Sequence, residues 1–329
     1  MANYESINLE KGMYVGDFTT ALEKIDPSIN YHETPLEGMD AFERQLKRFD
    51  IRVSGSGSDR IEKFFQSSDS AVLFPEYVSR AVKQGMKDAD MLDNIVATTT
   101  QIEAPDYRPL NVENEGVYEF YPEVYESGQI PEITIRNSSN LVSLKKRGCL
   151  ISTTYEALRF HRLDLFTVVL KQLGAQIARE QFDDAVEVLL NSPRSVDRDD
   201  IENISYNDLL KLWTAVWPYK LNTLIVAPNK MIEIMRLKQF RDSSGGLNFH
   251  ASGNIITPFG ATLVPSAKMS EDEVLGIDSN CALEMITAGG VLLESNKLID
   301  RQLENATISS LTGFTHIFPA ACHMLTLPL

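Results

Sequence analysis

The spacing of hydrophobic residues divides the chain into stretches of different periodicity. The clearest helical signal runs from Thr154 to Leu190, where apolar residues recur every three to four positions and no proline occurs. The stretch holds one glycine, Gly174, and Pro193 ends it. At 1.5 Å per residue such a helix would extend about 50 Å. The pattern therefore predicts a long helix whose one candidate bend lies at Gly174.

The first 75 residues carry only short helical patterns separated by breakers. Residues 38–49 place four apolar side chains on one face of a short helix, and the serine–glycine run at 54–58 predicts a flexible joint. We expect too few core residues here for independent folding. The segment is therefore predicted to lie across other parts of the fold or across neighbouring chains.

Residues 101–147 change to a β pattern. Aromatic and β-branched residues precede a turn at Ser127–Gly128 and isoleucines follow it, which predicts a long hairpin. Carboxylates are dense along it, at Glu113, Glu115, Glu119, Glu123, Glu126 and Glu132. Because an isolated two-stranded hairpin is marginally stable in water, this one is expected to need a partner surface.

From about residue 197 the pattern is mixed α/β. It predicts helices at 206–216 and 229–240, a strand at 221–227, a surface loop at 243–253, strands around a Pro-Phe-Gly turn within 253–269, a hairpin at 281–296 turning at Gly289–Gly290, and a closing β stretch at 308–325.

Composition narrows the class of protein. The net charge of -15, from 31 basic and 46 acidic residues, argues against binding nucleic acid through its phosphates. The acidity fits either simple solubility or a container wall along which DNA slides without sticking. No apolar run reaches the roughly 20 residues of a membrane span, and the N-terminus does not resemble a signal peptide. Three scattered cysteines, Cys149, Cys281 and Cys322, predict no disulfide framework or zinc site and fit a reducing cytoplasm.

No residue cluster predicts catalysis, cofactor binding or metal binding. Nucleotide-binding glycine loops, nucleophile elbows and zinc-binding helices are missing from the sequence. His316 and His323 are interpreted as hydrogen-bonded structural residues. The acidic pairs Asp183–Asp184 and 197–200 are interpreted as solvated or salt-bridged faces, and Trp213 and Trp217 as core packing.

Five stretches, taken together and in order, resemble the major capsid protein family of tailed bacteriophages. They cover most of residues 60–327: FFQSSDSAVLFPEYVSRAV (64–82), the hairpin end and helix entry (123–158), NTLIVAPNKMIEIMRL (222–237), ITPFGATLVPSAKM (256–269) and the closing section (282–327). The family shares its shell fold with the herpesvirus capsid floor and with encapsulins. The resemblance implies an α+β fold with an N-terminal arm, an extended β-hairpin loop, a long spine helix in a peripheral domain, and a mixed α/β axial domain.

The implied domain boundaries follow the same order. They are 1–104 for the arm and lead-in, 105–147 for the extended loop, 148–196 for the peripheral domain with its spine helix, 197–280 for the axial domain, and 281–329 for strands returning to both domains.

The resemblance implies a structural protein, not an enzyme, that assembles as pentamers and hexamers into an icosahedral head around double-stranded DNA. Its expected partners are further copies of the chain, a separate scaffolding protein, a portal, possible decoration proteins and DNA bound without sequence specificity. No membrane or cofactor is expected, and the location is the virion after assembly in the host cytoplasm. The alternatives are an encapsulin-like nanocompartment shell and an oligomeric α/β enzyme with an unrecognised site.

Hairpin and arm residues are the candidates for contacts between subunits. The hairpin candidates are Tyr118, Phe120, Tyr121, Glu123, Tyr125 and Glu126, and the basic residues Arg44, Lys47 and Arg48 are their candidate partners.

Two features bear on how the particle matures. Some family members join neighbouring subunits through a lysine of the extended loop, but residues 101–144 contain no lysine, and Lys145 and Lys146 stand only at the hairpin base. The sequence therefore predicts a shell without covalent cross-links. The first 75 residues are expected to stay in the particle, with scaffolding supplied by a separate protein.

Overall fold

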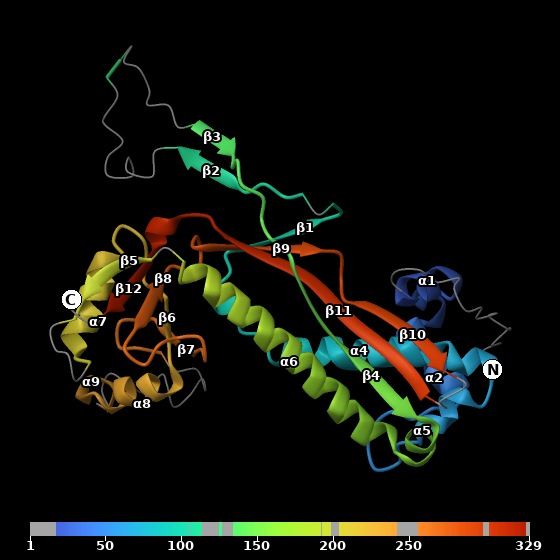
Figure 1. Ribbon diagram of the computed structural model, residues 1–329. Helices are drawn as coiled ribbons and strands as arrows, with labels where there is room; N and C mark the ends of the chain where they lie inside the picture. The colour runs from blue at the N-terminus through green and yellow to red at the C-terminus, as the bar shows by residue number, and fades with distance from the viewer. Residues whose placement is uncertain are drawn as a thin grey trace. The chain divides into compact units, whose positions relative to one another are not determined.

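The chain forms two structural units, each built from separate stretches of sequence (Figure 1). A computed structural model describes residues 18–104, 106–113, 125–126, 134–191, 193–198, 204–241, 256–298 and 303–326. The first unit combines residues 1–89, 148–178 and 291–309, and the second combines 90–147, 179–290 and 310–329. A limit between the two units falls at 147–148, where one boundary was predicted, whereas the predicted boundaries at 104, 196 and 280 are not limits of these units.

Helices dominate the first unit. They are α1 (Phe18–Ile25), η1 (Ser28–Tyr31), α2 (Ala41–Arg48), η2 (Ile61–Phe65), α3 (Ser68–Ala71), α4 (Leu73–Asp88), α5 (Tyr155–Phe160) and the first part of α6 (Leu163–Leu189). The predicted short helix at 38–49 is confirmed as α2. It begins at a capping box: the Asp40 side chain accepts a hydrogen bond from the Glu43 backbone amide, and the Glu43 side chain accepts one from the Asp40 backbone amide.

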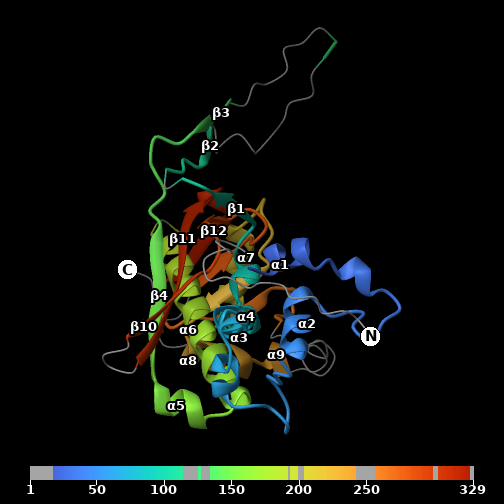
Figure 2. The same cartoon turned by 90° about the vertical axis from the view of Figure 1, so that its right-hand side faces the viewer.

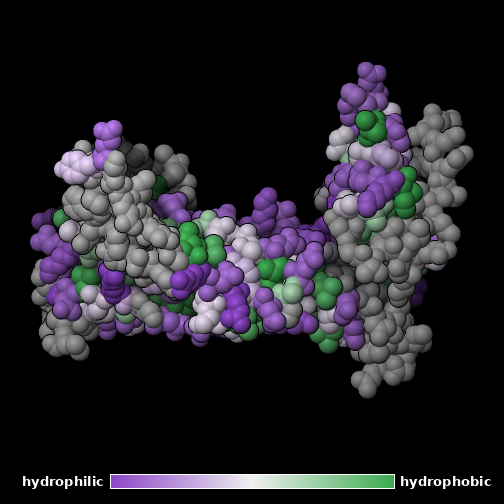
Figure 3. All heavy atoms as spheres, turned by 90° about the horizontal axis from the view of Figure 1, so that it is seen from above, coloured by the Kyte–Doolittle hydropathy of each residue, from purple (hydrophilic) through white to green (hydrophobic). Residues whose placement is uncertain are grey.

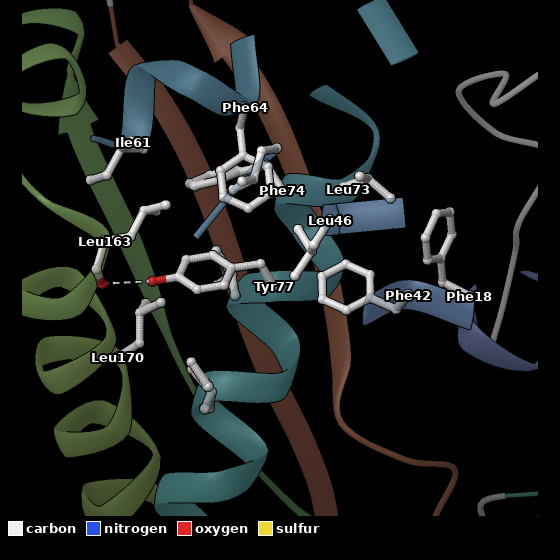
Figure 4. Close-up of a cluster of buried hydrophobic side chains, with 14 of the residues drawn as sticks. Phe18, Phe42, Leu46, Ile61, Phe64, Leu73, Phe74, Tyr77, Leu163 and Leu170 are labelled. Carbon is white, nitrogen blue, oxygen red and sulfur yellow. Dashed lines mark hydrogen bonds between the residues drawn. The ribbon is translucent and has the colours of Figure 1, made fainter. Parts of the chain in front are cut away.

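The N-terminal helices supply much of the first unit's hydrophobic core (Figure 4). Aromatic side chains of η2, α4 and α6 meet there, with the rings of Phe64 and Phe74 5.6 Å apart in an edge-on arrangement. The hydroxyl of Tyr77 donates to the Leu163 carbonyl at 2.9 Å, which joins α4 to the start of α6. Residues 18–75 thus share this core with α4, α6 and β11 (Leu303–His316), and the prediction that the segment does not fold independently stays a prediction.

The serine–glycine run at 54–58 is not the flexible joint that was predicted. The Ser58 amide donates to the Gly55 carbonyl at 3.0 Å, closing a turn. The guanidinium of Arg162 donates to the carbonyls of Gly55 and Ser56, both at 3.0 Å. A side chain a hundred residues away in sequence thus holds the turn, a contact that local composition cannot reveal.

The long helix is confirmed, but its interruption lies elsewhere than expected. The helical stretch breaks at His161–Arg162, between α5 and α6, and α6 then runs for 27 residues through Gly174. The backbone of Arg162 forms an isolated antiparallel β-bridge with the backbone of Arg60. Because a β-bridge requires extended backbone, the helix is interrupted at Arg162. Gly174 is required for a close helix contact and not for a bend.

Long strands also contribute to the first unit. β10 (Leu292–Leu298) pairs antiparallel with the first part of β11 (Leu303–His316), and β4 (Lys145–Thr154) also pairs with β11. A Cβ at Gly148 of β4 would overlap the Ile308 carbonyl oxygen, so only glycine permits this approach.

The second unit is built on a five-stranded sheet in the order β5-β12-β8-β6-β7. The strands are β5 (Arg194–Asp197), β6 (Thr223–Val226), β7 (Thr262–Pro265), β8 (Val274–Ile277) and β12 (Cys322–Thr326), preceded by η5 (Pro319–Ala321). Two buried clusters lie on its two faces, because successive side chains such as Leu224 and Ile225 point in opposite directions. Helices α7 (Tyr206–Ala215) and α8 (Pro228–Arg236) cover one face, with α9 (Lys238–Arg241) after α8.

Most predicted elements of this unit are confirmed. The helix at 206–216 and the strand at 221–227 appear as α7 and β6, and the helix at 229–240 appears as α8 and α9. The Pro-Phe-Gly turn before β7 is closed by the Gly260 amide, which donates to the Thr257 carbonyl at 2.9 Å. The predicted loop at 243–253 lies outside the described residues.

The hairpin predicted at 281–296 is wrong. β9 (Leu283–Ala288) pairs parallel with β1 (Thr98–Ile102) and antiparallel with the last part of β11, whereas β10 pairs with the first part of β11. Gly289–Gly290 therefore separates two strands that share a partner and do not pair with each other. The stretch at 308–325 likewise divides between β11 and β12, which belong to different sheets.

Candidate inter-subunit surfaces

A two-stranded ribbon stands apart from the five-stranded sheet of the second unit. β2 (Leu110–Glu113) pairs antiparallel with β3 (Thr134–Asn137), and in both views no other described strand lies beside them (Figures 1 and 2). Leu110 faces Asn137 in the ladder, so Leu110 and Ile135 share one face of the ribbon. Their exposed fractions are 60% and 61%. The ribbon thus presents an aliphatic face that the described part of its own chain does not cover.

The root of this ribbon is fixed by a buried hydrogen-bond cluster. The hydroxyls of Tyr107 and Thr100 both donate to the same carboxylate oxygen of Glu284 in β9, each at 2.6 Å. Partial burial raises the pKa of Tyr107, and its bond to the Glu284 carboxylate raises it further. The Val142 amide, in the segment between β3 and β4, donates to the Tyr107 carbonyl at 3.0 Å. Both strands therefore leave the unit from a braced base.

The hairpin candidates fall mostly beyond this root. Tyr118, Phe120, Tyr121 and Glu123 lie outside the described residues. Tyr125 is 79% exposed, and Glu126 beside it is also exposed. The two described candidates are thus on the surface.

The three basic candidates are in different positions. Arg44 is fully buried: it donates to the Asp26 carboxylate at 3.0 Å and to the Met39 carbonyl at 2.7 Å, and its guanidinium lies over the Tyr31 ring. Arg44 is therefore committed within its own arm and does not present its charge to a neighbouring subunit. Lys47 is exposed, and Arg48 is half-buried over the Phe49 ring.

Helix α7 carries a surface that the sequence interpretation missed. Trp213 and Trp217 were interpreted as core packing, but they are 47% and 76% exposed, and Leu210 on the same face is 37% exposed. The opposite face, with Leu209 and Leu212, is fully buried. The helical period was the available signal, since residues 209, 212 and 216 and residues 210, 213 and 217 mark two different faces.

A second exposed aliphatic group lies on the first unit. Leu165, Val168 and Val169 at the start of α6 are 56%, 64% and 50% exposed, and Phe160 of α5 is 63% exposed. On the face shown in Figure 3, hydrophobic residues reach the surface in small groups separated by hydrophilic ones. Small scattered groups of this kind are normal on protein surfaces and do not by themselves mark an interface.

Asp184 and His316 have hydrogen-bond partners within the chain, whereas the buried Nδ1 of His323 has none among the described residues. Asp184 is 4% exposed and accepts two bonds from Arg147, at 2.8 and 2.7 Å, and one from Lys145 at 2.9 Å. Its burial raises its pKa, but these bonds lower the pKa by more, so the net shift is downward. His316 bonds through Nε2 to the Val188 carbonyl at 2.9 Å. Burial and the nearby Arg194 lower the pKa of His323.

Among the described residues, no group of three or more His, Cys, Asp or Glu side chains is placed to hold a metal ion. In the same part of the chain, a search of the helices finds none with the length and hydrophobicity of a membrane span.

Comparison with known proteins gives one family match. A model described as phage capsid protein matches residues 138–300, from the residue after β3 through β10. No curated protein sequence matches the chain.

Solved capsid structures share the fold. A virus-like particle from Pyrococcus furiosus is similar with a TM-score of 0.52 and 12% identity, over 76% of this chain and 98% of that chain. The capsid of a native GTA particle is similar with a TM-score of 0.53 and 10% identity, over 75% of this chain and 91% of that chain. A structure from Microbacterium phage Oxtober96 is similar with a TM-score of 0.52 and 8% identity, over 73% of this chain and 91% of that chain.

The fold thus defines the class: an α+β fold of the kind found in solved phage capsid structures. The family match covers residues 138–300, slightly under half of the chain, and over that stretch the chain is similar to phage capsid proteins.

Proposed function

We propose that copies of this chain assemble as pentamers and hexamers into an icosahedral head that encloses double-stranded DNA. The observation that carries the proposal is the braced ribbon, which projects an aliphatic face with no cover in the described chain. Closed symmetry repeats each modest contact many times, so a stable shell does not require any single contact to be strong. The chain has no enzymatic role in this proposal.

The extended hairpin is proposed to lie over a neighbouring subunit. Its aromatic residues Tyr118, Phe120, Tyr121 and Tyr125 would anchor there, with Glu123 and Glu126 beside them. Lys47 and Arg48 remain the candidate cationic partners, since Arg44 is buried. The rigid root favours this role because a braced base lowers the entropy lost on docking.

The other partners follow from the same proposal. A scaffolding protein, a portal and possible decoration proteins would act during assembly in the host cytoplasm. The net charge of -15 supports DNA packed without sequence-specific binding. The nanocompartment and enzyme alternatives are not favoured, because the family match is to phage capsid proteins.

Deleting residues 117–135 and joining the ends with a short Gly-Ser linker tests the proposal. The expected result is a soluble, folded subunit that forms no shells by negative-stain electron microscopy, with or without a scaffolding protein. The double substitution Leu110→Ser and Ile135→Ser, which keeps the hairpin, should reduce shell yield. Normal particles from the deletion would refute the hairpin's role, and absence of shells from the wild-type chain in every condition would refute the assembly proposal.

A further inference from the structure

The α7 surface carries the most concentrated exposed aromatic area of the described chain. Trp213 and Trp217 are the only two tryptophans in the sequence, and with Leu210 they form a stripe spaced three and four residues apart. Each side chain reaches solvent while residues on the other face of α7 fill the core. Tryptophan is among the residues that dominate binding energy when an interface covers it.

Two lysines near this stripe in sequence, Lys211 and Lys220, are exposed. The one carboxylate of α7, Asp208, is fully buried and accepts from the Ser205 hydroxyl and amide at the helix start. We name Leu210, Trp213, Trp217 and Lys220 the α7 face.

A surface of opposite charge lies at the other edge of the same sheet. Ile232 of α8 is 46% exposed. Glu233 next to it is exposed but forms an ion pair with Lys230 of the same helix at 2.7 Å. Arg236 one turn further is exposed, so the acidic charge of this surface lies in the loop with Glu271 and Asp272. Glu271 and Asp272 are exposed, and the side-chain amide of Asn229 donates to Glu271 at 2.6 Å, which ties the acidic loop to α8. We name Ile232, Glu233, Glu271 and Asp272 the α8 face.

The two faces are arranged for a repeating contact. The sheet order places β5 and β12 at one edge and β7 at the other. α7 contacts β5 and β12, whereas α8 contacts β7, and both helices cover the same face of the sheet (Figure 1). Two different complementary surfaces on one unit permit a heterologous contact, and such a contact closes into a ring when its rotation allows.

We propose that the α7 face of one copy docks on the α8 face of a second copy. The tryptophans would cover Ile232, and Lys220 would pair with Glu271 and Asp272. This inference rests on the proposed shell function and names surfaces that meet within it. A second copy is the favoured occupant because the same unit supplies both the basic aromatic face and the acidic aliphatic face.

Charge reversal tests the contact. Lys220→Glu alone, and Glu271→Lys with Asp272→Lys, should each lower shell yield at least tenfold, because each places like charges together. The three substitutions combined should restore assembly to within threefold of wild type. Lys83→Glu, a reversal at an exposed lysine of α4 that lies outside both faces and outside the extended loop, is the matched control. Thermal unfolding of each unassembled subunit shows whether a variant folds.

A disulfide provides a second readout that does not depend on yield. Trp217→Cys and Ile232→Cys in one chain should give a ladder of oxidised oligomers on a non-reducing gel, and neither single variant should give it. Normal yield from the single-face reversals, failure of the triple variant to recover, or no ladder in assembled shells would overturn the contact while leaving the shell function standing.

If wild-type chains form no shells, the shell function fails. The same variants are then measured on oligomers by analytical ultracentrifugation. Loss of oligomers in the single-face reversals and their recovery in the triple variant would support the contact there, and any other pattern would overturn it.

Discussion

Gly174 of α6 lies against the backbone of Val82 in α4, so closely that a Cβ at position 174 would overlap the Val82 carbonyl oxygen. One turn away the relationship is reversed. A Cβ at Gly85 of α4 would overlap the Lys171 carbonyl oxygen in α6. One glycine on each helix therefore allows the two backbones to touch, and the pair fixes where α4 crosses α6.

Gly174→Ala should destabilise the subunit, although alanine favours helices. At an exposed helical position the change would add up to about 1 kcal/mol of stability. Here the methyl group meets backbone atoms that cannot rotate away, so we expect a loss of about 2–3 kcal/mol. Urea unfolding of the unassembled subunit measures the change. Gly57→Ala is the control, because the nearest atom there is the Arg52 side chain at 3.7 Å, and a Gly174→Ala midpoint at or above wild type would contradict the argument.

Acid should weaken the Asp184 cluster. The pKa of Asp184 is lowered in the folded protein because its bonds with Arg147 and Lys145 outweigh burial. A lowered folded pKa means that the stabilisation is fully present above the unfolded pKa of about 4 and is lost as the pH falls through the folded value. Asp184→Asn should therefore cost about 1–3 kcal/mol at pH 7. Urea midpoints at pH 7, 5, 4 and 3 should converge for the two proteins, and a constant gap would count against the assignment.

Local pattern was sufficient where one short stretch decides the structure. α7, β6 and the turn at Gly260 follow from helical period, an apolar run and a glycine at φ 89°. The pairing of β10 with β11 could not be predicted in this way, because the preference of Gly289–Gly290 for a turn is equally compatible with a break between two strands. Strand partners are chosen by contacts distant in sequence, and only the complete sheet reveals them.

The candidate surfaces show the same limit. The composition of residues 101–147 predicted the ribbon. It could not predict that Glu284, 177 residues from Tyr107 in sequence, bonds to Tyr107 at the ribbon's root. Arg44 resembled any surface arginine of an amphipathic helix, yet Asp26, outside that helix, draws it into the core. For Trp213, hydrophobicity favoured burial, while the period of α7 pointed to the opposite face.

Tyr107→Phe should loosen the ribbon root without unfolding the unit. Removing the hydroxyl leaves Glu284 with the Thr100 bond alone, at a cost of about 1–2 kcal/mol. The Val142 amide, which bonds to the Tyr107 carbonyl, should then exchange with deuterium roughly five- to thirtyfold faster. Tyr125→Phe, at a position 79% exposed, is the control. Unchanged exchange at Val142 in Tyr107→Phe would show that the hydroxyl does not brace the root.

Mature particles should dissolve completely into monomers in hot denaturing detergent. The expectation follows from the missing lysine between residues 101 and 144, because an amine on the extended loop is needed for an isopeptide link of the known kind. Gel electrophoresis of boiled particles should give a single capsid-protein band at the position of the unassembled subunit. A ladder that persists under reducing conditions would show that another pair of residues forms covalent links.

Arg44 and Lys47 should separate folding from assembly. Arg44→Met leaves the Asp26 carboxylate, and that of Glu23 3.5 Å from the guanidinium, without their cation, so we expect a loss of about 3–5 kcal/mol in subunit stability. Lys47→Glu changes an exposed side chain, and the subunit's stability should stay within about 0.5 kcal/mol of wild type.

If Lys47 pairs with the acidic hairpin of a neighbour, its reversal should instead lower shell yield, and more so at low salt, where exposed charges interact over longer distances. Urea unfolding and electron microscopy on the same two variants measure both effects. Normal assembly of Lys47→Glu at every salt concentration would remove Lys47 from the contact and direct the hairpin's carboxylates to another basic surface.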